Sequence, residues 1–548
     1  MIAMAAVMLA GLASCKDDAG GNVGGEDDNA AKVHLSISLN IPNGSSMART
    51  TEDSGIKETG IPAEYDIQNV TLYFFSISTV SPTTDYDYAG KYLQRLYIPS
   101  GNLGSPTLQS GDIYQYIATG AQTVTGLQPG GNYHVYAVVN GTTDLLLTNA
   151  TTERQFLDNS RVTGQYNTTG LVSVAAQTNG WLMSSRGKGT WNSKTEAFNT
   201  LNIAANNDAT NYATTGSVQL NVERVMGKLT ITADASNTYD IETVDGTKYA
   251  KAELTNVKVM NLRRDGYLFR HMTSIPAADT DASFATAIDG FKPLTNPTYT
   301  GNVITSDADY IIDPQTKNKT LANLAISATM ANWYTPLSEA VGTWGVAMPA
   351  VTTTENLGYC LENTMHSTMQ LNGFSTGLMF KAKITPEMII VSSGSSNNAA
   401  TPYTPVASTY PTFYNYGDQF YNDIQALENA GIPLNSAVTN EAAFTGTPTQ
   451  KEAALADLKS CGVTRCDNGV CYYYYWIKHE DNAQYMAVME YAIVRNNVYK
   501  MKVTGISGVG ESSEIIDPEE EDELTRVYLK VEMNILPWIV RENNNITL

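Results

Sequence analysis

The sequence is poor in basic residues and in charge of any kind. Its 548 residues include 34 lysines and arginines against 55 aspartates and glutamates, which gives a formal net charge of −21, and only 16% of the residues are charged. The basic residues form no stripe, and a chain this acidic is repelled by nucleic acid. We therefore expect no nucleic-acid partner.

Sequence motifs of catalysis and of metal binding are also missing. The five histidines are scattered along the chain, and no HExxH zinc motif, GxSxG nucleophile motif, phosphate-binding P-loop or dinucleotide-binding glycine pattern occurs. The sequence thus suggests no enzyme, and we predict neither a metal nor a cofactor.

Long apolar runs are absent as well. The apolar segment 2–12 is too short to span a bilayer, and it ends in Leu12-Ala13-Ser14-Cys15, which resembles a lipobox. We interpret residues 1–15 as a lipoprotein signal peptide, so that Cys15 would carry the lipid that attaches the precursor to the outer membrane. Residues 16–28 form an acidic, glycine-rich tether that resembles the surface-export signal of Bacteroidales lipoproteins. The body of the protein is then expected to be soluble and outside the cytoplasm.

Cysteine is scarce, and with Cys15 lipidated four thiols remain. In an oxidising compartment an even set favours disulfides, and four cysteines allow three pairings. The spacing of residues 461, 466 and 471 does not fit a zinc site. Possible disulfides therefore involve Cys360, Cys461, Cys466 and Cys471.

What the chain has in abundance is Thr, Asn, Ser, Gly and tyrosine, with 32 tyrosines. This composition favours strands over helices. Residues 33–41 alternate between apolar and polar, which predicts a half-buried strand. Its apolar face consists of Val33, Leu35, Ile37, Leu39 and Ile41.

The length exceeds three typical domains of ~150 residues. Segments 66–72 and 253–259 share one pattern (acid, aliphatic, any, Asn, Val, any, aliphatic), and each follows an opening strand. We therefore predict an all-β protein of two β-sandwich domains, at 50–215 and 216–548, with a few short helices. Segment 222–231 is expected to be one strand, 391–411 a surface loop, and residues near 148–158 and 441–460 short helices.

Two other segments leave alternatives open. The aromatic run 472–476 suits either a sugar-stacking platform or, more commonly, a strand packed on both faces. The acidic run 517–523 suits either calcium binding or, more commonly, a solvated connector.

The polar loop after the first strand contains Arg49, the only basic residue between Lys32 and Lys57. A protease that cuts after Arg49 would remove residues 16–49, the tether and propeptide, together with the strand. Five aliphatic side chains at ~1.5–3 kcal/mol each represent roughly 10 kcal/mol of burial before ordering costs. The vacated groove would accept another extended segment. The C-terminal segment 527–540 has the same alternation.

These residues together resemble Mfa-type major fimbrial subunits of Bacteroidales, the fimbrillins or type V pilins. The resemblance rests on the lipobox, on Ala48-Arg49-Thr50, on segments 222–224 and 362–364, and above all on Val494-Arg495-Asn496-Asn497-Val498-Tyr499 and Leu536-Pro537-Trp538. It implies two transthyretin-like domains and cleavage between Arg49 and Thr50 by an Arg-specific protease. It also implies polymerisation by donor-strand exchange into a cell-surface fimbria that serves adhesion and biofilm formation.

Under this resemblance the partners are other copies of the chain, accessory tip and anchor proteins, and the processing protease. The donor strand is assigned to residues 537–548, with Pro537, Trp538, Ile539, Val540, Ile546 and Leu548 as its main residues. Two alternatives stay open: a monomeric glycan-binding surface lipoprotein, and an anchor or tip fimbrillin.

Overall fold

The computed structural model describes a chain of β-sheets with a few short helices, so the predicted all-β class is confirmed. The described residues are 31–41, 58–59, 66–77, 89–109, 113–141, 145, 147–163, 180–186, 199–232, 236–275, 299–300, 303–304, 308–311, 313–314, 345–350, 353–364, 369–394, 397–403, 410–438, 440–479, 486, 490–523 and 528–539. Among them, no helix has both the length and the apolar character needed to cross a membrane.

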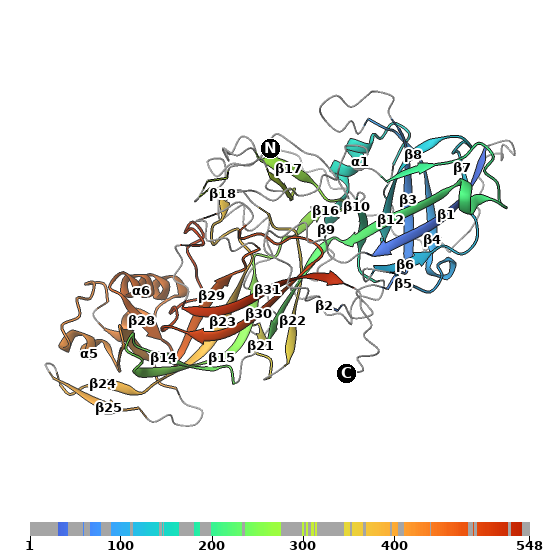
Figure 1. Ribbon diagram of the computed structural model, residues 1–548. Helices are drawn as coiled ribbons and strands as arrows, with labels where there is room; N and C mark the ends of the chain where they lie inside the picture. Colours follow the sequence, from blue (N-terminus) through green and yellow to red (C-terminus); the bar gives the residue numbers. More distant parts are fainter. Residues whose placement is uncertain are drawn as a thin grey trace, which may run out of the picture.

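The N-terminal half folds into one ten-stranded sheet (Figure 1). Its order is β4-β3-β8-β10-β12-β1-β6-β5, with β11 beside β8 and β7 beside β1. An apolar core lies within it, formed by alternate residues of the strands. The strands are β1 (Lys32–Ile41), β3 (Asn69–Ser76), β4 (Tyr92–Pro99), β5 (Thr107–Gln109), β6 (Ile113–Ile117), β7 (Gln122–Thr125), β8 (Asn132–Val139), β10 (Met183–Arg186), β11 (Thr200–Asn202) and β12 (Ser217–Arg224).

The C-terminal half contains two five-stranded sheets whose inner faces share a second apolar core. One sheet is β2 (Glu58–Thr59), β31 (Leu529–Ile539), β30 (Asn497–Ile506), β13 (Met226–Thr232) and β22 (Thr354–Leu361). The other is β14 (Thr238–Glu242), β15 (Lys248–Met260), β23 (Gly377–Pro386) and β29 (Val470–Trp476), with β21 (Val346–Ala347) beside β15.

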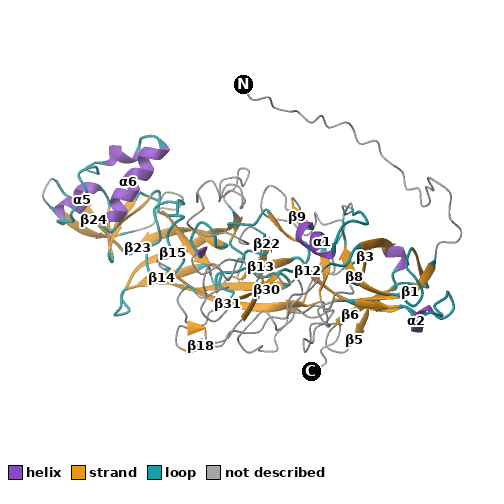
Figure 2. Cartoon of the chain, turned by 90° about the horizontal axis from the view of Figure 1, so that it is seen from above, coloured by secondary structure: helices purple, strands orange, loops and turns teal. Residues whose placement is uncertain are grey.

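A smaller lobe lies at the far end of the C-terminal half (Figures 1 and 2). It consists of a five-stranded sheet covered by two helices and has its own apolar core. Its elements are β24 (Met388–Ser392), β25 (Asn398–Pro402), β26 (Phe413–Tyr416), β27 (Gln419–Tyr421), α5 (Ile424–Asn429), the 3₁₀ turn Glu441–Phe444, α6 (Pro448–Ser460) and β28 (Val463–Cys466). We call this unit the distal lobe. Within segment 391–411, which was expected to be a loop, the residues up to 402 belong instead to the β24–β25 hairpin.

The short helices form where local signals favour them. Helix α6 begins with a capping box between Thr447 and Gln450 and has Pro448 in its first turn. Helix α1 (Glu153–Asn159) has the same box between Thr152 and Gln155. Both helices were predicted. The remaining short elements are the 3₁₀ turn Ser100–Asn102, α2 (Tyr212–Thr215), and the strands β9 (Arg161–Thr163), β16 (Asp265–Tyr267), β17 (Met272–Ile275), β18 (Tyr299–Thr300), β19 (Val303–Ile304) and β20 (Ala308–Ile311).

The segment expected as one strand over 222–231 is two strands in two different sheets. β12 ends at Arg224 in the N-terminal sheet, and β13 begins at Met226 in the C-terminal sheet. Only Val225, itself buried, separates them. A division of the chain after residue 215 separates β12 from the strands with which it pairs, whereas Val225 marks the point at which the chain changes sheets.

Candidate strand-exchange site

Strand β1 presents a complete apolar face to the N-terminal core. The predicted strand over 33–41 is confirmed, because β1 spans Lys32–Ile41. The five aliphatic side chains from Val33 to Ile41 are each 0 or 1% exposed. Alternation places them on one face, since successive side chains in a strand point to opposite sides. This segment therefore fills part of the core and is no surface ribbon.

Both backbone edges of β1 are hydrogen-bonded within the sheet. Residues 36–40 pair in parallel with β12, and residues 38–41 pair in antiparallel with β6 on the other side. Further along, residues 32–35 pair in antiparallel with β7. β1 is thus a central strand, shown in blue between β12 and β6 in Figure 1. We call the space bounded by β12, β6 and β7 the β1 slot.

Side chains from distant parts of the sequence complete the β1 slot. The side-chain amide of Asn207 pairs with the backbone of His34 as a neighbouring strand would. Its Oδ1 accepts from the His34 N–H and its Nδ2 donates to the His34 carbonyl, both at 2.8 Å. At the other end, Asn40 donates to Asn221 Oδ1 and accepts from Gln115 Nε2, each at 3.2 Å. Sequence reasoning missed these partners, since no local pattern marks contacts over 75 to 181 residues.

Gly216 lets the chain pass close to β1. A Cβ at this position would lie 2.6 Å from the His34 carbonyl oxygen and 3.2 Å from Leu35 Cδ2. Its own carbonyl accepts from the Ser36 N–H at 2.9 Å. A larger residue would therefore push β1 out of register with β12 at the start of their pairing.

Removing β1 would create two unpaired edges and an open apolar groove. Unsatisfied edge groups and exposed aliphatic surface both cost free energy, so an empty slot favours the insertion of another strand. The five buried side chains account for roughly 10 kcal/mol of apolar burial as an upper estimate. Any replacement strand must present the same alternation.

At the other end of the sequence, β31 forms an antiparallel pair with β30 along nearly its whole length. Pro537 lies opposite Asn497, and residues 538–539 pair in parallel with β2. Three of the predicted donor residues, Pro537, Trp538 and Ile539, therefore lie in a sheet of their own chain. Val540, Ile546 and Leu548 lie outside the described residues, as do Cys15, Arg49 and Thr50, so their predicted roles stay predictions.

The four cysteines that the structure describes form one disulfide, between Cys466 at the end of β28 and Cys471 in β29, with a Cα–Cα distance of 5.5 Å. Cys360 is buried and unpaired, and burial raises the pKa of its thiol to about 11. Cys461 is half-buried and likewise unpaired. Within the described ranges, no group of three or more His, Cys, Asp and Glu side chains is placed to hold a metal ion.

The aromatic run 472–476 is strand β29, packed on both faces. Tyr473, Tyr474 and Trp476 are at most 5% exposed. Burial raises the pKa of the Tyr473 and Tyr474 hydroxyls above the usual value, as expected of phenols in a core. This result favours the packed-strand interpretation of the run over the sugar-stacking one.

The acidic run 517–523 is docked on the protein and is no solvated connector. Backbone N–H groups of Asn372 and Gly373 donate to the carbonyls of Glu520 and Pro518, and Asp522 is only 1% exposed. Burial raises the pKa of Asp522 well above its usual value, although Ser375 donates a hydrogen bond to it. We call this docked segment the acidic strap.

Three of the segments that carry the family resemblance meet in one buried ionic cluster between the two halves. Arg495 donates from Nε and Nη2 to the two carboxylate oxygens of Glu362, both at 2.7 Å. Its Nη2 also donates to the Tyr267 carbonyl at 2.8 Å, and its Nη1 donates to the Leu268 carbonyl at 3.0 Å. Burial raises the pKa of Glu362, and the Arg495 charge opposes that rise. Next to this pair, Glu223 lies 4.0 Å from Arg495.

Apolar contacts join the halves at the same place. One buried cluster contains Trp181 and Tyr136 from the N-terminal half together with Met226, Tyr359 and Val498 from the C-terminal half. The rings of Trp181 and Tyr359 lie 3.8 Å apart between centroids. We call the ionic and apolar contacts together the junction. A continuous core of this kind makes the two halves one packed body.

Known proteins resemble this chain in two ways. Residues 465–544 match the family model described as "Major fimbrial subunit protein type IV, Fimbrillin, C-terminal". No curated protein matches the chain. This match covers β28 to β31, which includes the disulfide, the aromatic strand, Arg495 and the acidic strap.

Solved structures resemble the chain only distantly. A fimbrilin of Porphyromonas gingivalis is 14% identical with a TM-score of 0.36, over 93% of this chain and 99% of that one. A C-terminally truncated tip fimbrial protein of P. gingivalis is 9% identical with a TM-score of 0.30, over 92% and 100%. A fimbrial assembly protein of Parabacteroides distasonis is 14% identical with a TM-score of 0.25, over 51% and 86%.

Because these identities and TM-scores are so low, none of the structural likenesses supports a conclusion about this chain. The family match is the finding that bears on identity, and it contains segments 494–499 and 536–538, two of the segments on which the predicted resemblance rests. Residues 465–544 of this chain are therefore similar to the C-terminal part of fimbrillins, the major fimbrial subunit proteins that the family model describes.

Proposed function

We propose that the chain is the precursor of a fimbrial shaft subunit, exported as a lipoprotein through Cys15 and activated by cleavage after Arg49. Cleavage releases β1, and the C-terminal segment of a second copy takes its place in the β1 slot. The resulting homopolymer is a cell-surface fimbria that serves adhesion and biofilm formation, with accessory tip and anchor proteins at its ends. The role is structural and not enzymatic.

The proposal rests on one observation about β1. It is a central strand with a buried apolar face, yet only the segment 42–57 connects it to the rest of the chain. A single cut at Arg49 therefore leaves β1 held by noncovalent contacts alone. Noncovalent strands exchange, and a sheet with a vacant central position favours strand addition.

The C-terminal segment supports the donor role by its pattern and its location. β31 alternates as β1 does, and its last pairing partners, residues 58–59 of β2, follow closely after the cleavage site in the sequence. A cut after Arg49 would therefore create a new chain end near β31, the proposed donor, and release β1 from the β1 slot in the same event.

The primary experiment is digestion of the purified precursor with an Arg-specific protease, followed by electrophoresis without boiling. The wild type should give a ladder of heat-labile oligomers. Arg49→Ala should stay monomeric, whereas deletion of 537–548 should be cleaved but not extended. Normal polymerisation of Arg49→Ala would show that the activation site is wrong. A precursor that keeps its lipid and never polymerises would instead favour the anchor alternative.

A pinned variant separates cleavage from strand release. Asn40 and Gln115 lie opposite each other on β1 and β6, and their side chains are already hydrogen-bonded. Opposed antiparallel residues have Cβ atoms about 4.5–5.5 Å apart, close to the distance that a disulfide bridges. Asn40→Cys with Gln115→Cys, once oxidised, should be cut normally and yet remain monomeric, and dithiothreitol should restore polymerisation.

The wild type with dithiothreitol is the control for the pinned variant, because reduction also opens the Cys466–Cys471 bond. If the oxidised and cleaved variant polymerised as fast as the wild type, release of β1 would be unnecessary for assembly. The strand-exchange proposal would then fail, although the fimbrial family assignment would stand.

A further inference from the structure

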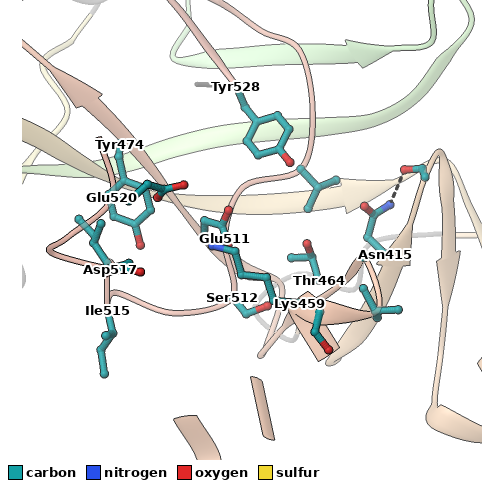
Figure 3. A pocket seen from close by; sticks show the side chains of 16 residues that line it. Asn415, Lys459, Thr464, Tyr474, Glu511, Ser512, Ile515, Asp517, Glu520 and Tyr528 are labelled. Atoms are coloured by element: carbon teal, nitrogen blue, oxygen red, sulfur yellow. Dashed lines mark hydrogen bonds and ion pairs between the residues drawn. The ribbon is translucent and has the colours of Figure 1, made fainter. Parts of the chain in front are cut away.

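A polar pocket of about 490 Å³ lies between the distal lobe and the segment that leads from β30 to β31. Its walls come from the end of α6, from β28, from the β26–β27 turn, from Tyr474 of β29, and from residues 509–520 and 528 (Figure 3). Binding sites for small ligands have volumes of about 300–1,000 Å³. The pocket therefore has the size of a site for one or two sugar rings.

The lining offers both hydrogen-bond donors and acceptors. Carboxylates come from Glu511, Asp517 and Glu520, and the Lys459 ammonium lies 3.1 Å from Glu511 Oε2. The hydroxyls of Thr464 and Tyr528 add groups that donate and accept. In Figure 3 the Tyr528 side chain points from the upper wall toward the centre of the pocket.

Apolar groups line the same pocket. Ile515 is 68% exposed, and Tyr528 is half-buried and directs its ring into the pocket (Figure 3). A tyrosine face suits the C–H face of a sugar ring, which is apolar while its edge carries hydroxyls.

The pocket walls are held in place before any ligand binds. Residues 472 and 511 exchange two backbone hydrogen bonds, at 2.9 and 2.7 Å. Ser512 Oγ accepts from the Arg465 N–H at 2.8 Å, and Ser513 Oγ donates to Glu452 of α6 at 2.7 Å. A preformed site loses little conformational entropy on binding.

The charge of the lining selects among ligand classes. Three carboxylates against one ammonium repel anionic ligands, sialylated and sulfated glycans among them. A basic peptide would need acceptors only, whereas this pocket also presents an ammonium and hydroxyl donors. Uncharged sugar hydroxyls both donate and accept, so they match the mixed lining best.

We propose that this pocket binds a neutral oligosaccharide, with Tyr528 as the stacking face and Asp517 as an acceptor for sugar hydroxyls. The site lies on the C-terminal half, away from the β1 slot, and it acts in the uncleaved precursor as well as in a polymer. Whether this pocket binds sugar is therefore independent of whether strand exchange occurs.

The test is saturation-transfer NMR on the full-length Arg49→Ala precursor, which we expect to stay monomeric. The probes are lactose, mannotriose, maltotriose and chitotriose at about 10 mM, enough to detect millimolar affinity, with 3′-sialyllactose as the charged counterpart of lactose. At least one neutral probe should bind. 3′-Sialyllactose should not bind.

Matched variants then locate the site. Tyr528→Ala and Asp517→Asn should each weaken the binding of the neutral sugar by about tenfold. Tyr97→Ala and Asp245→Asn, an exposed tyrosine and an exposed aspartate elsewhere, should leave it unchanged. Equal thermal unfolding temperatures of the four variants would show that each retains the fold.

Three results would overturn the proposal. One is that none of the four neutral sugars binds. Another is that their binding survives both pocket substitutions. The third is that triarginine amide binds and loses affinity in Asp517→Asn while the sugars do not bind, which would assign the pocket to basic peptides.

Discussion

Residue 39 allows the release of β1 to be measured as a stability difference. Leu39 of β1 and Leu220 of β12 are register partners in the same sheet, and both are fully buried. Truncating a buried leucine to alanine costs about 2–5 kcal/mol through lost apolar burial and the cavity left behind. In the uncleaved precursor, Leu39→Ala and Leu220→Ala should therefore lower the free energy of unfolding by similar amounts.

After cleavage the two variants should behave differently. If β1 departs with the propeptide, residue 39 is no longer in the folded protein, and the cost of Leu39→Ala disappears. The cost of Leu220→Ala persists, because β12 stays. The assay is urea denaturation of each protein before and after Arg-specific digestion and removal of the released fragment. Every protein in this assay also lacks residues 537–548, so that it is not expected to polymerise.

Two outcomes would refute this reasoning. A penalty for Leu39→Ala that persists after cleavage would show that β1 remains in its slot. The absence of any penalty in the precursor would show that the face of β1 is not part of the core. A change in the denaturant slope would instead indicate that the N-terminal sheet no longer unfolds as one unit.

Three further predictions follow from the rest of the molecule. Arg495→Met should lower the thermal midpoint by an amount equivalent to about 3–5 kcal/mol, because it leaves the buried Glu362 carboxylate without its partner. Arg495→Lys should restore only part of this lost stability, since one ammonium cannot replace the bidentate guanidinium. Burial raises the pKa of Glu490 from 4.5 to about 7, so the folded protein binds a proton more tightly than the unfolded chain. The protonated Glu490 therefore contributes its whole stabilisation below pH 4.5, and this contribution is lost as the pH rises through about 7. In Glu490→Gln the urea concentration at the unfolding midpoint should depend less on pH across that range. The Cys466–Cys471 loop is short, with a sequence separation of 5, so replacing both cysteines by serine should cost roughly 2 kcal/mol, and dithiothreitol should destabilise the wild type but not this variant.

Elements with a strong local signal were predictable from the sequence. The alternation over residues 33–41 predicted β1 because only one of its faces meets the core, so the period of two survives in the sequence. Helix α6 was predictable from its helix-forming composition. In both cases the information lies within one short segment.

Features that depend on distant pairing were not predictable. Aliphatic residues occupy even positions from 218 to 222 and the odd positions 225, 229 and 231, and this shift of one position would look the same for a β-bulge within one strand as for a change of sheet. The Asn207 contact with His34 joins residues 173 positions apart. Likewise, four cysteines allowed three pairings, and only the packing of β28 beside β29 selects Cys466–Cys471.

The acidic strap shows why interpreting a run of charged residues as a solvated connector was wrong. Seven residues with six acids suggested solvent exposure, since charged groups are seldom buried. Here backbone groups bond to residues 370–373, and only Asp517 and Glu519 are exposed. Asp522 is fully buried, and the Glu520 and Glu523 carboxylates accept hydrogen bonds from Asn372 and Lys478, each at 3.2 Å. Composition describes side chains, and it does not reveal where backbone donors and acceptors find partners.

The junction connects the β1 slot and β31 by one short path through the protein. β12 forms one wall of the β1 slot and ends at Arg224, whose Nη1 donates to Asn496 Oδ1 at 3.3 Å. Asn496 immediately precedes β30, whose first residue Asn497 pairs with Pro537 of β31. A pulling force applied at β31 therefore reaches the slot wall through buried hydrogen bonds and sheet pairing, without crossing an exposed linker. In a polymer joined by the proposed strand exchange, every subunit would carry the load between these two points, and the buried Arg224–Asn496 hydrogen bond lies on that path.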